Sequence, residues 1–169
     1  DSRSYSAPEK ITLSRLPITS NVLFGREEVL KQLDDAWQLN QANIFSLVGW
    51  GGAGKSALVN PWLRQLAEEN YRGAERVYGW SFYSQGNNDQ ATSAEPFIHH
   101  ALEWFGDQDP RKGNPWEKGE RLAYLIRKYK ALLVLDGLEP IQHPPGPTEG
   151  ALQEPSLTAL LRELAAHNP

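Results

Sequence analysis

Cysteine and methionine are both absent from this sequence of 169 residues. Without cysteine, the chain can form neither disulfides nor thiolate metal sites. A natural translation product begins with methionine, and position 1 is an aspartate. We therefore expect the chain to be a segment of a longer protein.

Long apolar runs and an excess of positive charge are also lacking. No apolar stretch approaches the ~20 residues of a membrane span and no signal peptide is visible, so we expect a cytoplasmic protein with no membrane partner. The formal net charge of −4 gives no electrostatic reason to expect nucleic acid as a partner. With 40% hydrophobic and 22% charged residues, the composition is that of an ordinary globular domain.

The stretch from Gly49 to Ser56 reads Gly-Trp-Gly-Gly-Ala-Gly-Lys-Ser and fits the P-loop pattern G-x-x-x-x-G-K-[ST]. The apolar run 44–48 precedes it and predicts a buried strand, and the residues after it predict a helix over about 55–70. Glycines at this spacing let successive backbone N–H groups point at phosphate oxygens, and the helix N-terminus adds its positive dipole end.

These features predict a site for a nucleotide and Mg²⁺. Lys55 would reach the β- and γ-phosphates as a point charge, and the hydroxyl of Ser56 would bind the metal ion. The residues expected to contact the nucleotide here are Gly49, Trp50, Gly51, Gly52, Ala53, Gly54, Lys55, Ser56 and Ala57.

Strands and helices alternate along the rest of the chain. Residues 1–20 are polar, contain two prolines and predict a linker or a surface arm. Apolar periodicity predicts helices over about 29–37, 94–105, 120–130 and 156–167, while aromatic and apolar runs predict strands at 76–83 and 131–135. The segments 106–119 and 140–155 are rich in glycine or proline and predict loops. This alternation is typical of an α/β protein with a doubly wound parallel sheet.

Two acidic residues follow the apolar run 131–135. Asp136 stands where open α/β sheets place ligand contacts, and it could hold Mg²⁺ opposite Ser56 as a Walker B acid does. Glu139 could orient and deprotonate the water that attacks the γ-phosphate. Simpler interpretations remain open, because Asp136 before Gly137 also suits a turn and Glu139 also suits an exposed surface.

Three segments together resemble the STAND class of signalling NTPases, the NB-ARC and NACHT relatives, in their bacterial form. They are Phe24-Gly25-Arg26-Glu27, the P-loop at Gly49–Ser56 and the stretch Leu132–Glu139. The stretches 78–85 and 113–121 also resemble bacterial members, and the likeness places the domain at residues 21–169. The resemblance implies base-side contacts from Phe24, Gly25 and Arg26, and it gives Glu139 the position of the second acid of the NACHT Walker B motif.

The resemblance also implies an incomplete P-loop NTPase sheet with flanking helices. In that class a later strand with a polar sensor residue lies between the P-loop strand and the Walker B strand. Neither this strand nor the winged-helix region is in the present sequence. A gap of this kind exposes unpaired backbone, so we expect either a partner segment within it or self-association.

For function, the resemblance implies a regulatory switch in signalling or antiviral defence. ADP would hold the parent protein closed, ATP would open it, and slow Mg-dependent hydrolysis would reset it. Self-association through the NTPase domain would activate an effector domain elsewhere in the parent chain, and the isolated segment is expected to be inactive. One alternative is a small-molecule or nucleotide kinase, in which 131–135 would pair directly with 44–48. Another is a nucleotide-stabilised scaffold without turnover.

Overall fold

The computed structural model describes residues 4–19, 25–39, 44–48, 54–83, 93–143 and 146–166. Its centre is a parallel sheet with strand order β1-β2-β3, formed by β1 (Lys10–Thr12), β2 (Arg76–Ser81) and β3 (Ala131–Asp136). The helices in this part of the chain are α1 (Glu27–Gln38), α2 (Lys55–Glu68), α3 (Glu95–Trp104), α4 (Pro115–Ile126) and α5 (Pro155–Ala166), with the short 3₁₀ turns η1 (Asn70–Gly73) and η2 (Glu139–Ile141). The predicted α/β class with a parallel sheet is confirmed.

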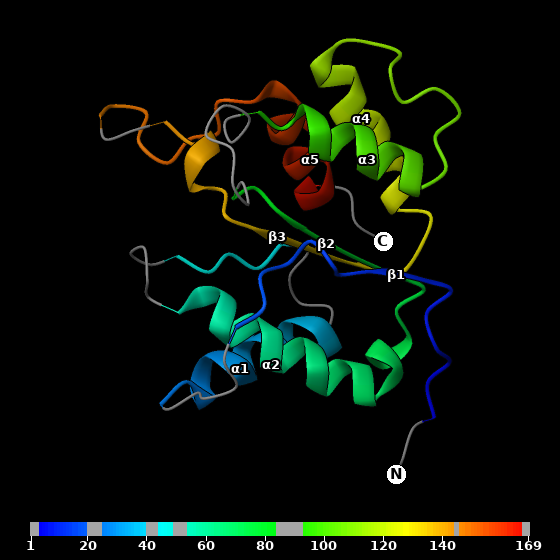
Figure 1. Cartoon of the computed structure of the whole chain (residues 1–169), viewed down its shortest axis with the longest axis vertical. Helices are drawn as coiled ribbons and strands as arrows, with labels where there is room; N and C mark the ends of the chain where they lie inside the picture. The colour runs from blue at the N-terminus through cyan, green and yellow to red at the C-terminus, as the bar shows by residue number, and fades with distance from the viewer. Residues whose placement is uncertain are drawn as a thin grey trace.

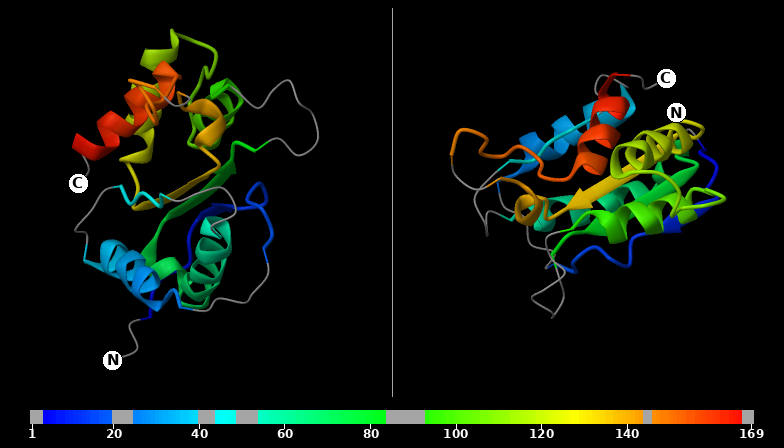
Figure 2. Two further views of the ribbon diagram at one scale, coloured as in Figure 1. Left: turned by 90° about the vertical axis from the view of Figure 1, so that its left-hand side faces the viewer. Right: turned by 90° about the horizontal axis from the view of Figure 1, so that it is seen from above.

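Helices cover both faces of the sheet (Figure 1). The helices α1 and α2 lie on one face and α3, α4 and α5 on the other, and the left view of Figure 2 shows the same layers. Side chains of β2 alternate between two cores: Val77 joins Leu58 and Leu66 of α2, whereas Tyr78 and Trp80 join the core under α3, α4 and α5. This period of two buries the strand on both faces, as expected for a covered parallel sheet.

The N-terminal arm adds a strand that the sequence did not predict. β1 pairs in parallel with β2, with Lys10 opposite Arg76. The Lys10 Nζ donates a hydrogen bond to the Trp104 carbonyl at 2.8 Å, and the Arg15 guanidinium lies 4.4 Å from the centre of the Trp80 ring. The described part of the arm, residues 4–19, is therefore attached to the sheet edge through β1 and to α3 through Lys10.

The apolar run 44–48 has no strand structure, so the prediction of a strand there is wrong. A strand depends on hydrogen bonds to a neighbouring strand, and β3 has its ladder with β2. Within the described ranges no ladder joins 44–48 to β3, which is the pairing that the kinase alternative requires. Leu47 still packs against the core on the α2 side, whereas Val48 is 94% exposed.

The helix α4 begins earlier than predicted, inside the expected loop 106–119. The side chain of Asn114 accepts a hydrogen bond from the backbone N–H of Glu117 at 2.9 Å, and the Glu117 carboxylate accepts one from the backbone N–H of Asn114 at 3.0 Å. This capping box, with Pro115 at the first helical position, starts the helix. The other predicted helices, and the strands of β2 and β3, are confirmed within a few residues at their ends.

Candidate functional site

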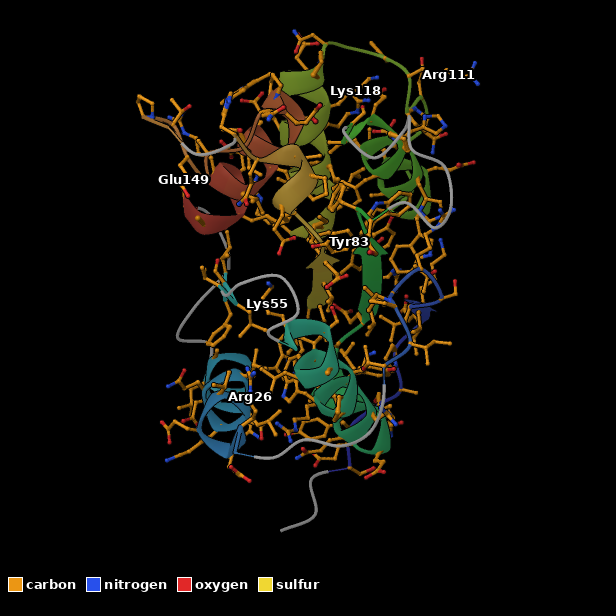
Figure 3. The ribbon with its side chains drawn as sticks, turned by 60° about the vertical axis from the view of Figure 1, so that its left-hand side comes forward. Arg26, Lys55, Tyr83, Arg111, Lys118 and Glu149 are labelled. Atoms are coloured by element: carbon orange, nitrogen blue, oxygen red, sulfur yellow. The ribbon has the colours of Figure 1, made fainter. Side chains whose placement is uncertain are left out.

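The candidate site lies at the carboxyl ends of β2 and β3, where α2 begins. Asp136 is the last residue of β3, and Ser81, the last residue of β2, is its register partner. Lys55 is the first residue of α2, and Figure 3 shows it at the same end of the sheet as Tyr83, which follows β2. Ligand sites of open α/β sheets lie at this edge.

Two hydroxyl groups orient the Asp136 carboxylate. The Ser56 Oγ donates a hydrogen bond to Asp136 Oδ1 at 2.7 Å, and the Ser81 Oγ donates one to Asp136 Oδ2 at 3.2 Å. Ser56 and Asp136 are 80 residues apart in the sequence, and the fold brings together these two residues that the sequence predicted as Mg²⁺ ligands.

A second set of contacts forms around Glu139, in η2. Its Oε1 lies 3.1 Å from the Lys55 Nζ, and its Oε2 accepts a hydrogen bond from the Tyr83 hydroxyl at 2.9 Å. The Lys55 side chain is 23% exposed and the Glu139 side chain 45% exposed, so this pair is reached by solvent. We assign it little net stability for that reason.

These contacts set the protonation states of Glu139 and Tyr83. Burial by itself would raise the pKa of Glu139, but hydrogen bonds from its own backbone N–H, from Tyr83 and from Lys55, with the charge of Lys55, outweigh burial and lower that pKa. Burial and the hydrogen bond to Glu139 raise the pKa of Tyr83 to about 12. At neutral pH Glu139 is therefore a carboxylate and Tyr83 a hydrogen-bond donor.

A tight turn after β3 places Glu139 against Tyr83. Gly137 has φ +70°, in the left-handed region that favours glycine. A Cβ built on Gly137 would lie 2.4 Å from Cδ2 of Tyr83, so the phenol ring packs directly on the glycine backbone. The turn and the ring contact together hold η2 beside the end of β2.

The upstream Gly-Arg element reaches the start of α2. Gly54, which precedes α2, has φ +77°, and a Cβ built on it would lie 3.8 Å from Nη2 of Arg26. Arg26 itself precedes α1, after the exposed Gly25 with φ +70°. The fold thus brings Arg26 next to the last glycine of the P-loop pattern, with Ala57 in the first turn of α2.

Several predicted contacts lie outside the described residues. They are Phe24 and the P-loop residues Gly49, Trp50, Gly51, Gly52 and Ala53. Their expected roles toward the base and the phosphates stay predictions.

The residues present fit a magnesium ion bound together with phosphate. A hydroxyl and a carboxylate oxygen meet here beside an ammonium group, and Mg²⁺ prefers oxygen ligands, of which one or two come from the protein when phosphates and water supply the others. The part of the chain that the structure describes holds no group of three or more His, Asp or Glu side chains able to form an all-protein metal site. Ser56 and Asp136 would hold the ion.

Sequence reasoning missed Ser81 and Tyr83, which contact Asp136 and Glu139 respectively. The stretch 76–83 predicted a strand because of its aromatic residues, and its hydroxyl groups were not considered as part of the site. The rule that parallel strands place functional groups at their carboxyl ends would have identified both, since Ser81 ends the strand next to β3 and Tyr83 follows it by two residues.

No protein-family model, curated protein or solved structure matches the chain. The sequence motifs and the geometry of the site are therefore the observations that bear on function. Among the helices described, none is long and apolar enough to cross a membrane.

Proposed function

We propose that this chain is the first part of a STAND-like P-loop ATPase domain, which binds ATP or ADP with Mg²⁺ and acts as a regulatory switch of its parent protein. The observation that carries the proposal is the hydrogen bond of 2.7 Å between Ser56 and Asp136. The sequence assigned these residues to the two halves of one site from separate motifs. Their meeting at the carboxyl edge of a parallel sheet supports that assignment.

Each residue of the site has a distinct role in this proposal. The ammonium group of Lys55 binds the β- and γ-phosphates. Arg26, whose guanidinium lies near Gly54, contacts the base in this proposal. Ser56 and Asp136 hold Mg²⁺, which neutralises charge on the phosphate oxygens when it is bound. Glu139, ionised at neutral pH, orients the attacking water and accepts its proton.

The switch follows from contacts that differ between ATP and ADP. Lys55 pairs with Glu139 at 3.1 Å, and a phosphate group would compete with Glu139 for the same ammonium. Because the γ-phosphate adds contacts that ADP lacks, ATP favours the state in which Lys55 has left Glu139. Hydrolysis removes these contacts and returns the site to the ADP-bound state.

The lack of strand structure at 44–48 agrees with the gap that the STAND resemblance implies in the sheet. In the STAND class another strand lies between the P-loop strand and the Walker B strand. Without that strand, 44–48 should have no partner and no ladder, and the described residues there have no strand structure. We propose that a segment of the parent protein occupies this position.

Replacing Glu139 by glutamine tests the proposal. In the full-length protein, Glu139→Gln should reduce ATP turnover about 100-fold or more, because general-base catalysis contributes about that much. ATP binding should persist and become tighter, because the amide no longer competes for Lys55. Glu149→Gln is the matched control, since Glu149 is an exposed carboxylate in the loop before α5, away from the site (Figure 3). Native protein that binds ATP without turnover would favour the scaffold, and phosphate transfer to an acceptor would favour the kinase.

A further inference from the structure

Tyr83 contacts the site through its hydroxyl, its ring and its backbone. The hydroxyl donates to Glu139 Oε2 at 2.9 Å, and the ring packs on Gly137. The backbone N–H of Tyr83 donates to the Ser81 Oγ at 3.4 Å, and that oxygen in turn donates to Asp136. The end of β2 thereby contacts both acids of the site.

The two oxygens of Glu139 have different partners. Oε1 faces the ammonium of Lys55 at 3.1 Å and Oε2 faces the Tyr83 hydroxyl. When a phosphate group binds the Lys55 ammonium, Oε1 of Glu139 loses its ion pair. The hydrogen bond from the Tyr83 hydroxyl to Oε2 does not involve Lys55 and stays in place. One oxygen then becomes available to water while the other stays held.

We propose that Tyr83 is a positioning residue that fixes Glu139 by Oε2, so that capture of Lys55 by phosphate exposes Oε1 to the attacking water. This inference rests on the function proposed above. It explains why a half-exposed carboxylate on a short 3₁₀ turn can have a defined direction: its contact with Tyr83 does not depend on Lys55.

The phenol ring of Tyr83, a residue that is 50% exposed, lies against the backbone of Gly137 on one side. A Cβ on Gly137 would lie 2.4 Å from Cδ2 and 2.6 Å from Cε2 of the ring, so only glycine leaves the ring this close to the turn. A general base works when it lies within hydrogen-bond reach of the proton, and a displacement of about 1 Å can cost about 100-fold in rate. A Tyr83 variant that keeps the ring and loses the hydroxyl isolates this contribution.

The variant Tyr83→Phe removes the hydrogen bond and keeps the packing on Gly137. We expect ATP turnover to fall about tenfold or more, because Glu139 is no longer aimed at the water, and the affinity for a fluorescent ADP analogue to stay within about twofold. Tyr124→Phe is the matched control, since Tyr124 is a 59% exposed tyrosine on α4.

A double-mutant cycle with Glu139→Gln tests whether Tyr83 acts through Glu139. Tyr83→Phe should have no further effect on turnover in the Glu139→Gln background. A second measurement is the affinity for the ADP analogue without Mg²⁺. Glu139→Gln should bind the analogue more tightly than native protein, because the amide no longer competes for Lys55. The turnover cycle measures how far Tyr83 positions Glu139. The affinity measures the competition between Glu139 and phosphate for Lys55, independently of turnover.

Four results would overturn the inference. Equal turnover in native protein and Tyr83→Phe would show that the hydroxyl does not position Glu139. The same fractional loss in both backgrounds, or a weaker ADP analogue affinity with a lower melting temperature, would show a general structural role. Native protein that binds no nucleotide would instead refute the proposed function and this inference with it, so the two failures are distinguishable.

Discussion

Replacing Gly137 by alanine should destabilise the protein through two separate effects. The backbone of Gly137 has φ +70°, where an L side chain costs about 1 kcal/mol or slightly more. The new Cβ would also lie 2.4 Å from Cδ2 of Tyr83, so the ring must move and its hydroxyl must leave Glu139. A hydrogen bond to a charged group contributes about 1.5–3 kcal/mol, and the 45% exposure of the Glu139 side chain reduces this to about 1 kcal/mol.

The expected destabilisation is therefore about 2–3 kcal/mol, which corresponds to a melting temperature lower by about 4–12 °C for a chain of this length. Gly150→Ala is the matched control, because Gly150 has φ +77° and a Cβ there would meet nothing within 4 Å. Gly150→Ala should carry only the cost of the left-handed backbone. In a urea titration, the free energy of unfolding should therefore fall by about 1 kcal/mol more in Gly137→Ala than in Gly150→Ala. Equal losses in the two variants would refute the close contact between Gly137 and Tyr83.

Two further predictions concern the core under α3, α4 and α5. Gly119→Ala should destabilise the protein by about 3 kcal/mol, since a Cβ on Gly119 would lie 2.1 Å from the Ser156 carbonyl oxygen. An unchanged urea midpoint would contradict this prediction, because it would show that α4 and α5 can separate at no cost. Burial, and after it the charge of Arg15, lowers the pKa of His100 in the folded protein. As the pH falls, His100 is therefore protonated in the unfolded chain before it is protonated in the folded one. The free energy of unfolding should decrease as the pH drops below about 6.5. Melting temperatures between pH 7.5 and pH 5 should decline less in His100→Asn than in native protein or in His99→Asn, and parallel curves would contradict this.

Elements with a strong local pattern could be predicted from the sequence. The spacing of apolar residues in α5 and the continuous apolar run of β3 are visible in the local sequence. Both elements lie close to the ranges predicted from it. The meeting of Ser56 with Asp136 was predictable too, because strand ends and the helix after a P-loop have fixed places in an α/β sheet.

The remaining features depend on contacts between distant segments. β1 has three residues in a polar arm, and it is a strand because β2 offers it an edge. The run 44–48 has the composition of a strand but lacks a paired neighbour in the described part of the chain. The start of α4 was locally encoded, since Asn114 and Glu117 form a capping box, but the glycines and prolines around it were interpreted as a loop.

The central claim is that Lys55 binds the phosphates of a nucleotide, and an equilibrium titration of a fluorescent ADP analogue with Mg²⁺ tests it most directly. A charged hydrogen bond contributes about 1.5–3 kcal/mol, so Lys55→Ala should weaken binding about 10- to 100-fold. Lys128→Ala is the matched control, since Lys128 is an exposed lysine over the Tyr124 ring, and it should bind as native protein does. Equal affinity of native protein and Lys55→Ala, or no binding by native protein, would contradict the account.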